Sequence, residues 1–365
     1  MIKIHIFKDF FKSLDQTIIG CLIIILSTGL MALYSADQEW FNEFNAQLVN
    51  ISIGLIALVF ISKTSPKIIF FYVPFLYIIG IILLLWVKFF GFEVNGSQRW
   101  IDIGFMKFQP SELYKLVMPL MLAWFYQNNE RAITYKVHVT AFIFMIIPFY
   151  FILIQPDLGT ALMIAFSSVA IIFTAGLSRK IITWSFIVIS LSSPFIWKNL
   201  ENYQQNRILS LFDPFKDALG AGYQTIQSLI ALGSGGLIGK GWLNSSQTQL
   251  NFLPEATTDF IFAVYSEEFG FIGVLAILSI YIALLLRILF IVSKMQDTFS
   301  RLASLGLLVS LFAGVLVNLG MISGLLPIVG APLPFFSYGG TSMVVSLVSI
   351  GIIMSLYNHK SLIAN

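Results

Sequence analysis

The strongest constraint on this chain is a series of apolar segments, each long enough to cross a lipid bilayer as a helix. A spanning helix needs about 20 mostly apolar residues, and by that measure we count roughly ten segments. They lie at residues 17–36, 46–62, 67–89, 110–127, 137–155, 159–177, 181–198, 269–292, 302–322 and 341–357. Only 11% of the 365 residues are charged, too few to cover a water-soluble core of this size. The sequence therefore predicts an all-α, multi-pass membrane protein.

Basic residues indicate how this bundle is oriented. Lys and Arg are enriched in the N-terminal segment and in the connections after the second, fourth, sixth and eighth segments. Cytoplasmic connections carry this excess in membrane proteins, so we expect both termini to be cytoplasmic. Most Asp and Glu residues then fall on the outer side. We interpret residues 1–365 as a single membrane domain, with a large outer loop at about 199–268 between the seventh and eighth spans.

Several classes of site are excluded by the residues available. His5, His138 and His359 all lie near the inner surface, and Cys21 is the only cysteine, so an outer catalytic site has no imidazole base, zinc site or haem ligand from these residues. The net charge of +3 is small and dispersed, which argues against nucleic acid as a partner. A carboxylate would have to serve as the catalytic base.

A glycine cluster at 233–241, GSGGLIGKG, resembles a phosphate-binding loop only superficially. Gly241 follows Lys240 where that motif requires Ser or Thr, so we reject a nucleotide site. We expect an interfacial or re-entrant turn packed on the bundle.

The stretch 96–115 combines charged residues with the start of a predicted span. Pro110 suits a first helical turn, and Glu112 and Lys115 then lie three residues apart on one helix face. Ionisable groups within a span usually face a polar cavity, although a buried structural ion pair is the alternative. Arg99 is suited to a phosphate or to an ordinary place in the interfacial belt.

Three further outer stretches carry candidate residues. Asp157 is best explained as a cap of the following helix. Pro254 is expected to open a helix that places Glu255 and Asp259 on one face within an apolar collar, so that either a general base or helix capping explains these acids. Residues 318–342, which are rich in glycine and proline, are expected to form an ordered re-entrant segment on the same cavity.

Taken together, these motifs resemble the SEDS (shape, elongation, division and sporulation) family of peptidoglycan glycosyltransferases over nearly the whole chain. The resemblance is carried by GSQRWIDIG, FQPSE, QPDLGT, GSGGLIGKGW, FLPEATTDFIFAV and GLLPIVGAPLPFFSYGGTS, and the wording GKGWL and QLNFLPE favours the branch that acts in cell elongation. One departure is Thr257, where the family commonly has His.

The resemblance implies an inverting enzyme in the bacterial cytoplasmic (inner) membrane. It would polymerise lipid II at the outer face and release undecaprenyl diphosphate. Asp259 would be the catalytic base, and the implied substrate-binding residues are Arg99, Glu112, Lys115, Arg207 and Lys240. Asp157, Glu255, Gly339 and Gly340 would have supporting roles. A divalent cation, Mg²⁺ or Mn²⁺, is a candidate cofactor, and the implied partners are membrane lipids and a class B penicillin-binding protein.

Two other functions remain alternatives at this point. A lipid II flippase would suit a bundle with an internal Glu and Lys, but it should show interrupted helices at the midplane with access to both faces. A non-catalytic scaffold for the elongation machinery would require no single outer carboxylate.

Overall fold

The computed structural model describes residues 14–37, 42–94, 97–102, 104, 107–199, 202–218, 220 and 222–358. Its long helices are α2 (Gln16–Ala36), α3 (Asn42–Ser62), α4 (Pro66–Phe90), α5 (Pro110–Asn128), α6 (Tyr135–Ile154), α7 (Leu158–Thr174), α8 (Arg179–Asn199), α12 (Ile261–Ser293), α13 (Thr298–Ile322) and α14 (Gly340–Asn358). Each predicted apolar segment overlaps one of these helices, which confirms the predicted fold class.

Seven of the described helices are long and apolar enough to cross a membrane: α2, α3, α4, α6, α12, α13 and α14. The apolar helix α7 is shorter. The chain is therefore a multi-pass membrane protein, while the total of ten spans stays a prediction. The predicted cytoplasmic placement of the termini concerns segments that lie mostly outside the described residues.

Helix ends follow from local sequence. Asp15, Asp157 and Asp297 cap α2, α7 and α13 through side-chain oxygens that accept the N–H three residues later. Pro110 stands in the first turn of α5, as its missing N–H and fixed φ favour. The predicted capping role of Asp157 is thus confirmed.

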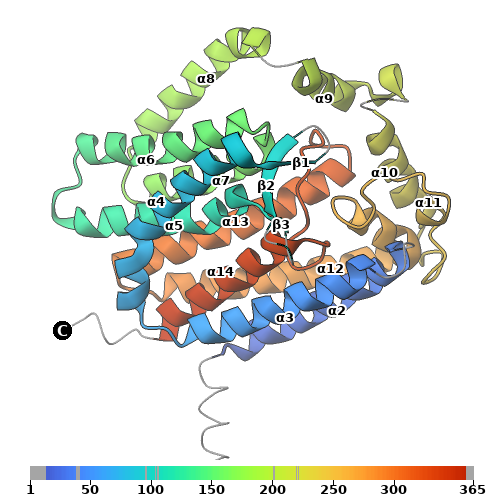
Figure 1. Cartoon of the computed structure of the whole chain (residues 1–365), viewed down its shortest axis with the longest axis horizontal. Coiled ribbons are helices and arrows are strands. Elements are labelled where there is room, and N and C mark those ends of the chain that lie inside the picture. Colours follow the sequence, from blue (N-terminus) through green and yellow to red (C-terminus); the bar gives the residue numbers. More distant parts are fainter. Residues whose placement is uncertain are drawn as a thin grey trace, which may run out of the picture.

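Small residues allow the central helices to approach closely. A Cβ added at Gly351 of α14 would lie 2.8 Å from the carbonyl oxygen of Leu58 in α3, so only glycine fits at this crossing. Among the helices able to span, α13 and α14 are the most buried. Figure 1 shows most long helices running side by side, with α8 at the edge of the bundle.

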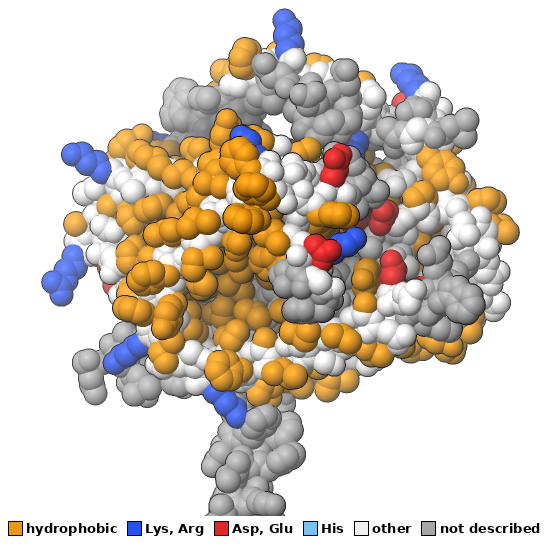
Figure 2. Space-filling model, viewed as in Figure 1, with side chains coloured by type: hydrophobic (Ala, Val, Ile, Leu, Met, Phe, Trp, Pro, Cys, Tyr) orange, Lys and Arg blue, Asp and Glu red, His pale blue; other side chains and the backbone are white. Residues whose placement is uncertain are grey.

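The polar elements gather at one end of the bundle (Figure 1). They include α9 (Asn202–Phe212), η2 (Pro214–Asp217), α10 (Tyr223–Ser234) and α11 (Ser246–Gln249), all within the predicted outer loop, whereas η1 (Glu130–Ala132) follows α5. Figure 2 shows a largely hydrophobic face, and most acidic side chains visible on it lie toward the α9–α11 end.

A small antiparallel sheet between α4 and α5 was not expected from the sequence. Strands β1 (Phe92–Val94), β2 (Ser97–Asp102) and β3 (Lys107–Phe108) pair in the order β1-β2-β3. Lys107 lies opposite Asp102, and Trp100 opposite Phe92. The sheet leads into α5 at Pro110 and places Arg99 near the turn between α6 and α7.

Helix α12 is broken at Gly270, whose φ of 63° and ψ of −167° are not helical. The glycine cluster at 233–241 supplies hydrogen-bond partners for the backbone groups at this break. Backbone N–H groups of Lys240 and Gly241 donate to the carbonyls of residues 267 and 268 (3.0 Å each), and those of residues 271 and 272 donate to the carbonyls of residues 236 and 237 (2.9 and 3.1 Å). The cluster is therefore a turn packed on the bundle.

One sequence expectation about this region was wrong. The part of α12 that follows the break at Gly270 agrees with the predicted span at 269–292, but the helix expected to open at Pro254 does not form. Residues 254–260 form turns, so Glu255 and Asp259 do not share a helix face. The reason is that Glu255 adopts a left-handed φ of 55°, and its carbonyl accepts the N–H groups of both Thr258 and Phe260 (3.2 Å each), which closes a turn in place of a helix.

Candidate functional site

Asp259 lies at the end of the 254–260 turn, directly before α12. Asp259 is half-buried. Burial and the charge of Glu255 raise the pKa of Asp259 to about 7, with Arg207 and Lys115 acting in the opposite direction and Asp157 adding a further upward contribution. A carboxyl group with this pKa is suited to accept a proton near neutral pH.

A segment after α13 covers this carboxyl group. A Cβ added at Gly330 would lie 3.4 Å from Asp259 Oδ2, and Gly330 has a φ of 72°, which favours glycine. Arg207 Nη1 of α9 donates to the carbonyl of Ile328 (3.0 Å). The predicted re-entrant segment therefore does border the candidate base.

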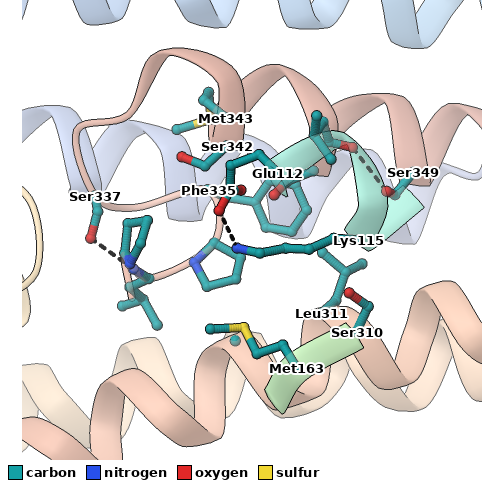
Figure 3. A pocket seen from close by; sticks show the side chains of 16 residues that line it. Glu112, Lys115, Met163, Ser310, Leu311, Phe335, Ser337, Ser342, Met343 and Ser349 are labelled. Atoms are coloured by element: carbon teal, nitrogen blue, oxygen red, sulfur yellow. Dashed lines mark hydrogen bonds and ion pairs between the residues drawn. The ribbon is translucent and has the colours of Figure 1, made fainter. Parts of the chain in front are cut away.

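Glu112 and Lys115 form the predicted ion pair, with Lys115 Nζ 2.6 Å from Glu112 Oε1. Figure 3 shows the pair beside a cavity lined by residues of α5, α7, α13, α14 and the segment before α14. The cavity has a volume of about 30 Å³, enough for an ordered water. Its lining mixes polar side chains, among them Ser310, Ser337 and Ser342, with apolar ones, so this is a partly polar pocket inside the bundle.

Arg99 and Asp157 join the sheet to the helices. Arg99 Nε donates to the carbonyl of Gln155 (2.8 Å), its Nη2 donates to that of Pro156, and its Nη1 lies 3.9 Å from Asp157 Oδ1. Asp157 Oδ2 also accepts from Gln109 Nε2 and Ser111 Oγ, each at 2.9 Å. Both side chains are thus engaged by the protein itself.

Lys240 forms an ion pair with Glu267, a residue outside the candidate set. Its Nζ lies 2.5 Å from Oε1 of Glu267, a residue of α12 with no exposed surface. Glu267 also accepts from Ser245 Oγ (2.5 Å) and Ser246 Oγ (2.6 Å). The neighbouring Glu268 accepts the N–H of Leu243 (3.1 Å).

The remaining candidates have structural positions. Gly340 begins α14, and the N–H of Gly339 donates to Gln47 Oε1 (3.2 Å). Thr257, which replaces the common His, accepts the N–H of Tyr338 through its carbonyl (3.0 Å).

Sequence reasoning missed Glu267, Glu268 and Asn318. Adjacent acids within an otherwise apolar helix are a signal for the first two, because such charges are costly unless satisfied. No local pattern marks Asn318, whose contacts come from residues distant in the sequence. Among the described residues, no three His, Cys, Asp or Glu side chains gather as a metal site would require.

The arrangement brings together one carboxylate, Asp259, and two cations near enough to influence it, Lys115 and Arg207. A base beside positive charge suits a transfer reaction in which a hydroxyl group loses a proton and an anionic group departs.

Comparison with known proteins agrees with these motifs. The family model described as "Cell cycle protein", which covers FtsW, RodA and SpoVE, matches residues 9–362. The chain is 41% identical to the peptidoglycan glycosyltransferase MrdB of Escherichia coli K12, over 96% of this chain and 95% of the relative. It is 35% identical to the stage V sporulation protein E of Bacillus subtilis, over 95% and 97% of the two chains.

Two solved structures show the same fold. One, described as "Structural coordination of polymerization and crosslinking by a peptidoglycan synthase complex", has a TM-score of 0.84 at 31% identity and covers 95% of this chain and 98% of its own. The rod shape determining protein RodA of Thermus thermophilus has a TM-score of 0.73 at 26% identity, with 95% and 97% covered. With a family match over almost its entire length, this chain belongs to the FtsW, RodA and SpoVE family, the SEDS proteins.

Proposed function

We propose that this chain is a peptidoglycan glycosyltransferase of the cell elongation machinery, which polymerises lipid II into glycan strands at the outer face of the bacterial cytoplasmic membrane. The observation that carries the proposal is the half-buried Asp259 carboxyl group, with a pKa of about 7, near Lys115 and Arg207. The names of the similar proteins support the reaction class.

In the proposed reaction, Asp259 takes the proton of the acceptor sugar's 4-hydroxyl group. The freed oxygen attacks the donor's anomeric carbon from the face opposite the diphosphate. The new glycosidic C–O bond forms as the carbon–oxygen bond to the diphosphate breaks, so the configuration inverts and undecaprenyl diphosphate leaves with the electron pair. A positioned general base contributes about 10²–10⁴-fold to such a rate.

The departing diphosphate needs positive charge. Lys115 and Arg207 are the cations near Asp259, and Glu112 holds Lys115 in place through the ion pair. Arg99 and Lys240 interact mainly with protein groups. We therefore propose that Arg99 holds the sheet and Lys240 holds the outer loop.

The described residues do not fit a resident site for Mg²⁺ or Mn²⁺, because they bring no three acidic, His or Cys ligands together. The proposed reaction therefore has no step at a metal ion. A class B penicillin-binding protein remains the proposed partner for crosslinking, supported by the fold's similarity to a chain of a peptidoglycan synthase complex.

The test is strand synthesis from purified lipid II by the purified protein, with and without a class B penicillin-binding protein. Asp259→Asn keeps the side-chain shape but accepts no proton, so polymerisation should fall by about 10²–10⁴-fold. Asp102→Asn, at an exposed position of β2, is the matched control and should polymerise normally. Strands made by Asp259→Asn at the wild-type rate would exclude this mechanism and favour a flippase or scaffold.

A further inference from the structure

Asn318 lies near the end of α13 with none of its surface exposed. Its side-chain nitrogen Nδ2 donates to two backbone carbonyls, that of Asp259 at 2.8 Å and that of Ala331 at 2.7 Å. One amide group thus bridges the residue proposed as the base and the segment that covers it.

The orientation of this amide is fixed by its surroundings. The other side-chain atom, Oδ1, is buried and has no hydrogen-bond partner within the described part of the chain. A buried acceptor without a donor is costly. A flipped amide would be worse, because it would place Oδ1 against two carbonyl oxygens. The observed orientation therefore satisfies both N–H donors and leaves only Oδ1 unpaired.

The two bridged segments meet at the carboxyl group. Ala331 follows Gly330, whose backbone passes close to Asp259 Oδ2. The same segments are joined a second time where the N–H of Tyr338 donates to the carbonyl of Thr257 (3.0 Å). Because the Asn318 amide holds the backbone of both Asp259 and Ala331, it sets how Asp259 faces Gly330.

We propose that Asn318 is a positioning residue for Asp259, which fixes the carboxylate relative to the covering segment through its two hydrogen bonds. The proposal rests on the proposed function, since it assigns to Asn318 the orientation of the base in that reaction. Asn318 itself touches no reacting atom.

Two substitutions should shift the pH dependence to different extents. The charged groups that influence Asp259 are Glu255 in its own turn, Arg207 on α9, Lys115 on α5 and Asp157 before α7. Asn318→Asp would place a carboxyl group against two carbonyl oxygens, where burial keeps it protonated, so its one O–H retains one of the two hydrogen bonds and the acidic limb of the pH–rate profile moves only slightly. Asn318→Ala adds no charge but releases Asp259 toward water, which would move that limb to lower pH.

Both variants should lower kcat while leaving the KM for lipid II unchanged, because the substrate contacts are intact. Misplacement of a reacting group by about 1 Å costs about 10²-fold, which is the loss we expect at the pH optimum. Loss of fold alone would reduce the amount of active protein without moving the pH limb.

The experiment is lipid II polymerisation across pH 5–9 by full-length protein at matched folded concentration. Asn128→Asp, at an exposed position of α5, is the matched control. A larger shift of the acidic limb in Asn318→Ala than in Asn318→Asp, with reduced kcat in both variants, supports the proposal. Wild-type kcat and pH limbs in both variants, or losses that only follow the folded fraction, would overturn it. If wild-type protein made no strands while Asn318 variants folded normally, the proposed function would fail first, and the positioning role would fall with it.

Discussion

Lys240 Nζ lies 2.5 Å from Glu267 Oε1, and the Glu267 side chain has no contact with solvent. This pair fastens the glycine cluster at 233–241 to the N-terminal part of α12. In this structure the pair engages a lysine that the family resemblance places among the substrate-binding residues.

We predict that Lys240→Met destabilises the fold. Loss of one partner from a fully buried pair costs about 3–5 kcal/mol, and because a third of the Lys240 side chain is exposed we expect less, about 1–3 kcal/mol. Thermal unfolding in detergent would measure the change. Lys216→Met is the control, since the Lys216 side chain is 83% exposed and that of its partner Asp213 is 44% exposed.

A second substitution sharpens this test. Adding Glu267→Gln to Lys240→Met removes the uncompensated charge, so part of the lost stability should return. An unchanged unfolding temperature combined with weaker lipid II binding would instead make Lys240 a substrate ligand.

The pH dependence of polymerisation should have an acidic limb near pH 7. Asp259 acts as a base only when ionised, and its pKa is raised to about 7 by burial and by Glu255. Activity is therefore lost as the pH falls through this value. Glu255→Gln removes one cause of the rise, so the limb should move to lower pH without reaching that of an ordinary carboxyl group, because burial remains. An acidic limb that stays in place in Glu255→Gln would contradict this account.

Lys115→Met should abolish polymerisation while leaving folded protein. It removes the cation nearest the cavity and leaves Glu112 without its partner inside the bundle. The double variant Glu112→Gln with Lys115→Met should recover stability but not activity, since a neutral pair cannot neutralise the leaving diphosphate. Polymerisation by the double variant would reduce the pair to packing.

The predicted orientation is open to labelling. In a Cys21→Ser background, single cysteines at Lys216 in the outer loop and Arg131 after α5 are both placed at exposed positions. An impermeant thiol reagent applied to spheroplasts should label the first and spare the second. Labelling of both would refute the ten-span arrangement.

The sequence predicted the helices well because the bilayer imposes one requirement on every span, a run of apolar residues of fixed length. Local patterns also predicted the Asp157 cap and the ion pair of Glu112 and Lys115, since each depends on residues a few positions apart. The same reasoning failed at Pro254, where the backbone conformation of Glu255 closes a turn in place of a helix.

The partners of Lys240 and Asn318 were beyond sequence reasoning for a different reason. Glu267 lies 27 residues after Lys240, and Asn318 reaches back 59 residues to Asp259. Such contacts depend on how the bundle closes. Local periodicity carries no information about that closure, so the pairing of Lys240 with Glu267 could not be predicted.

The break at Gly270 has a consequence for biogenesis. A helix that enters the membrane with missing internal hydrogen bonds exposes polar backbone groups at a high cost. Here the groups that complete α12 come from residues 236–241, upstream in the chain and therefore made before it. The ribosome thus releases the glycine cluster first, and its hydrogen bonds to α12 can form as that helix emerges. In a circular permutant with the glycine cluster after α12, that helix would enter the membrane before its hydrogen-bond partners were synthesised.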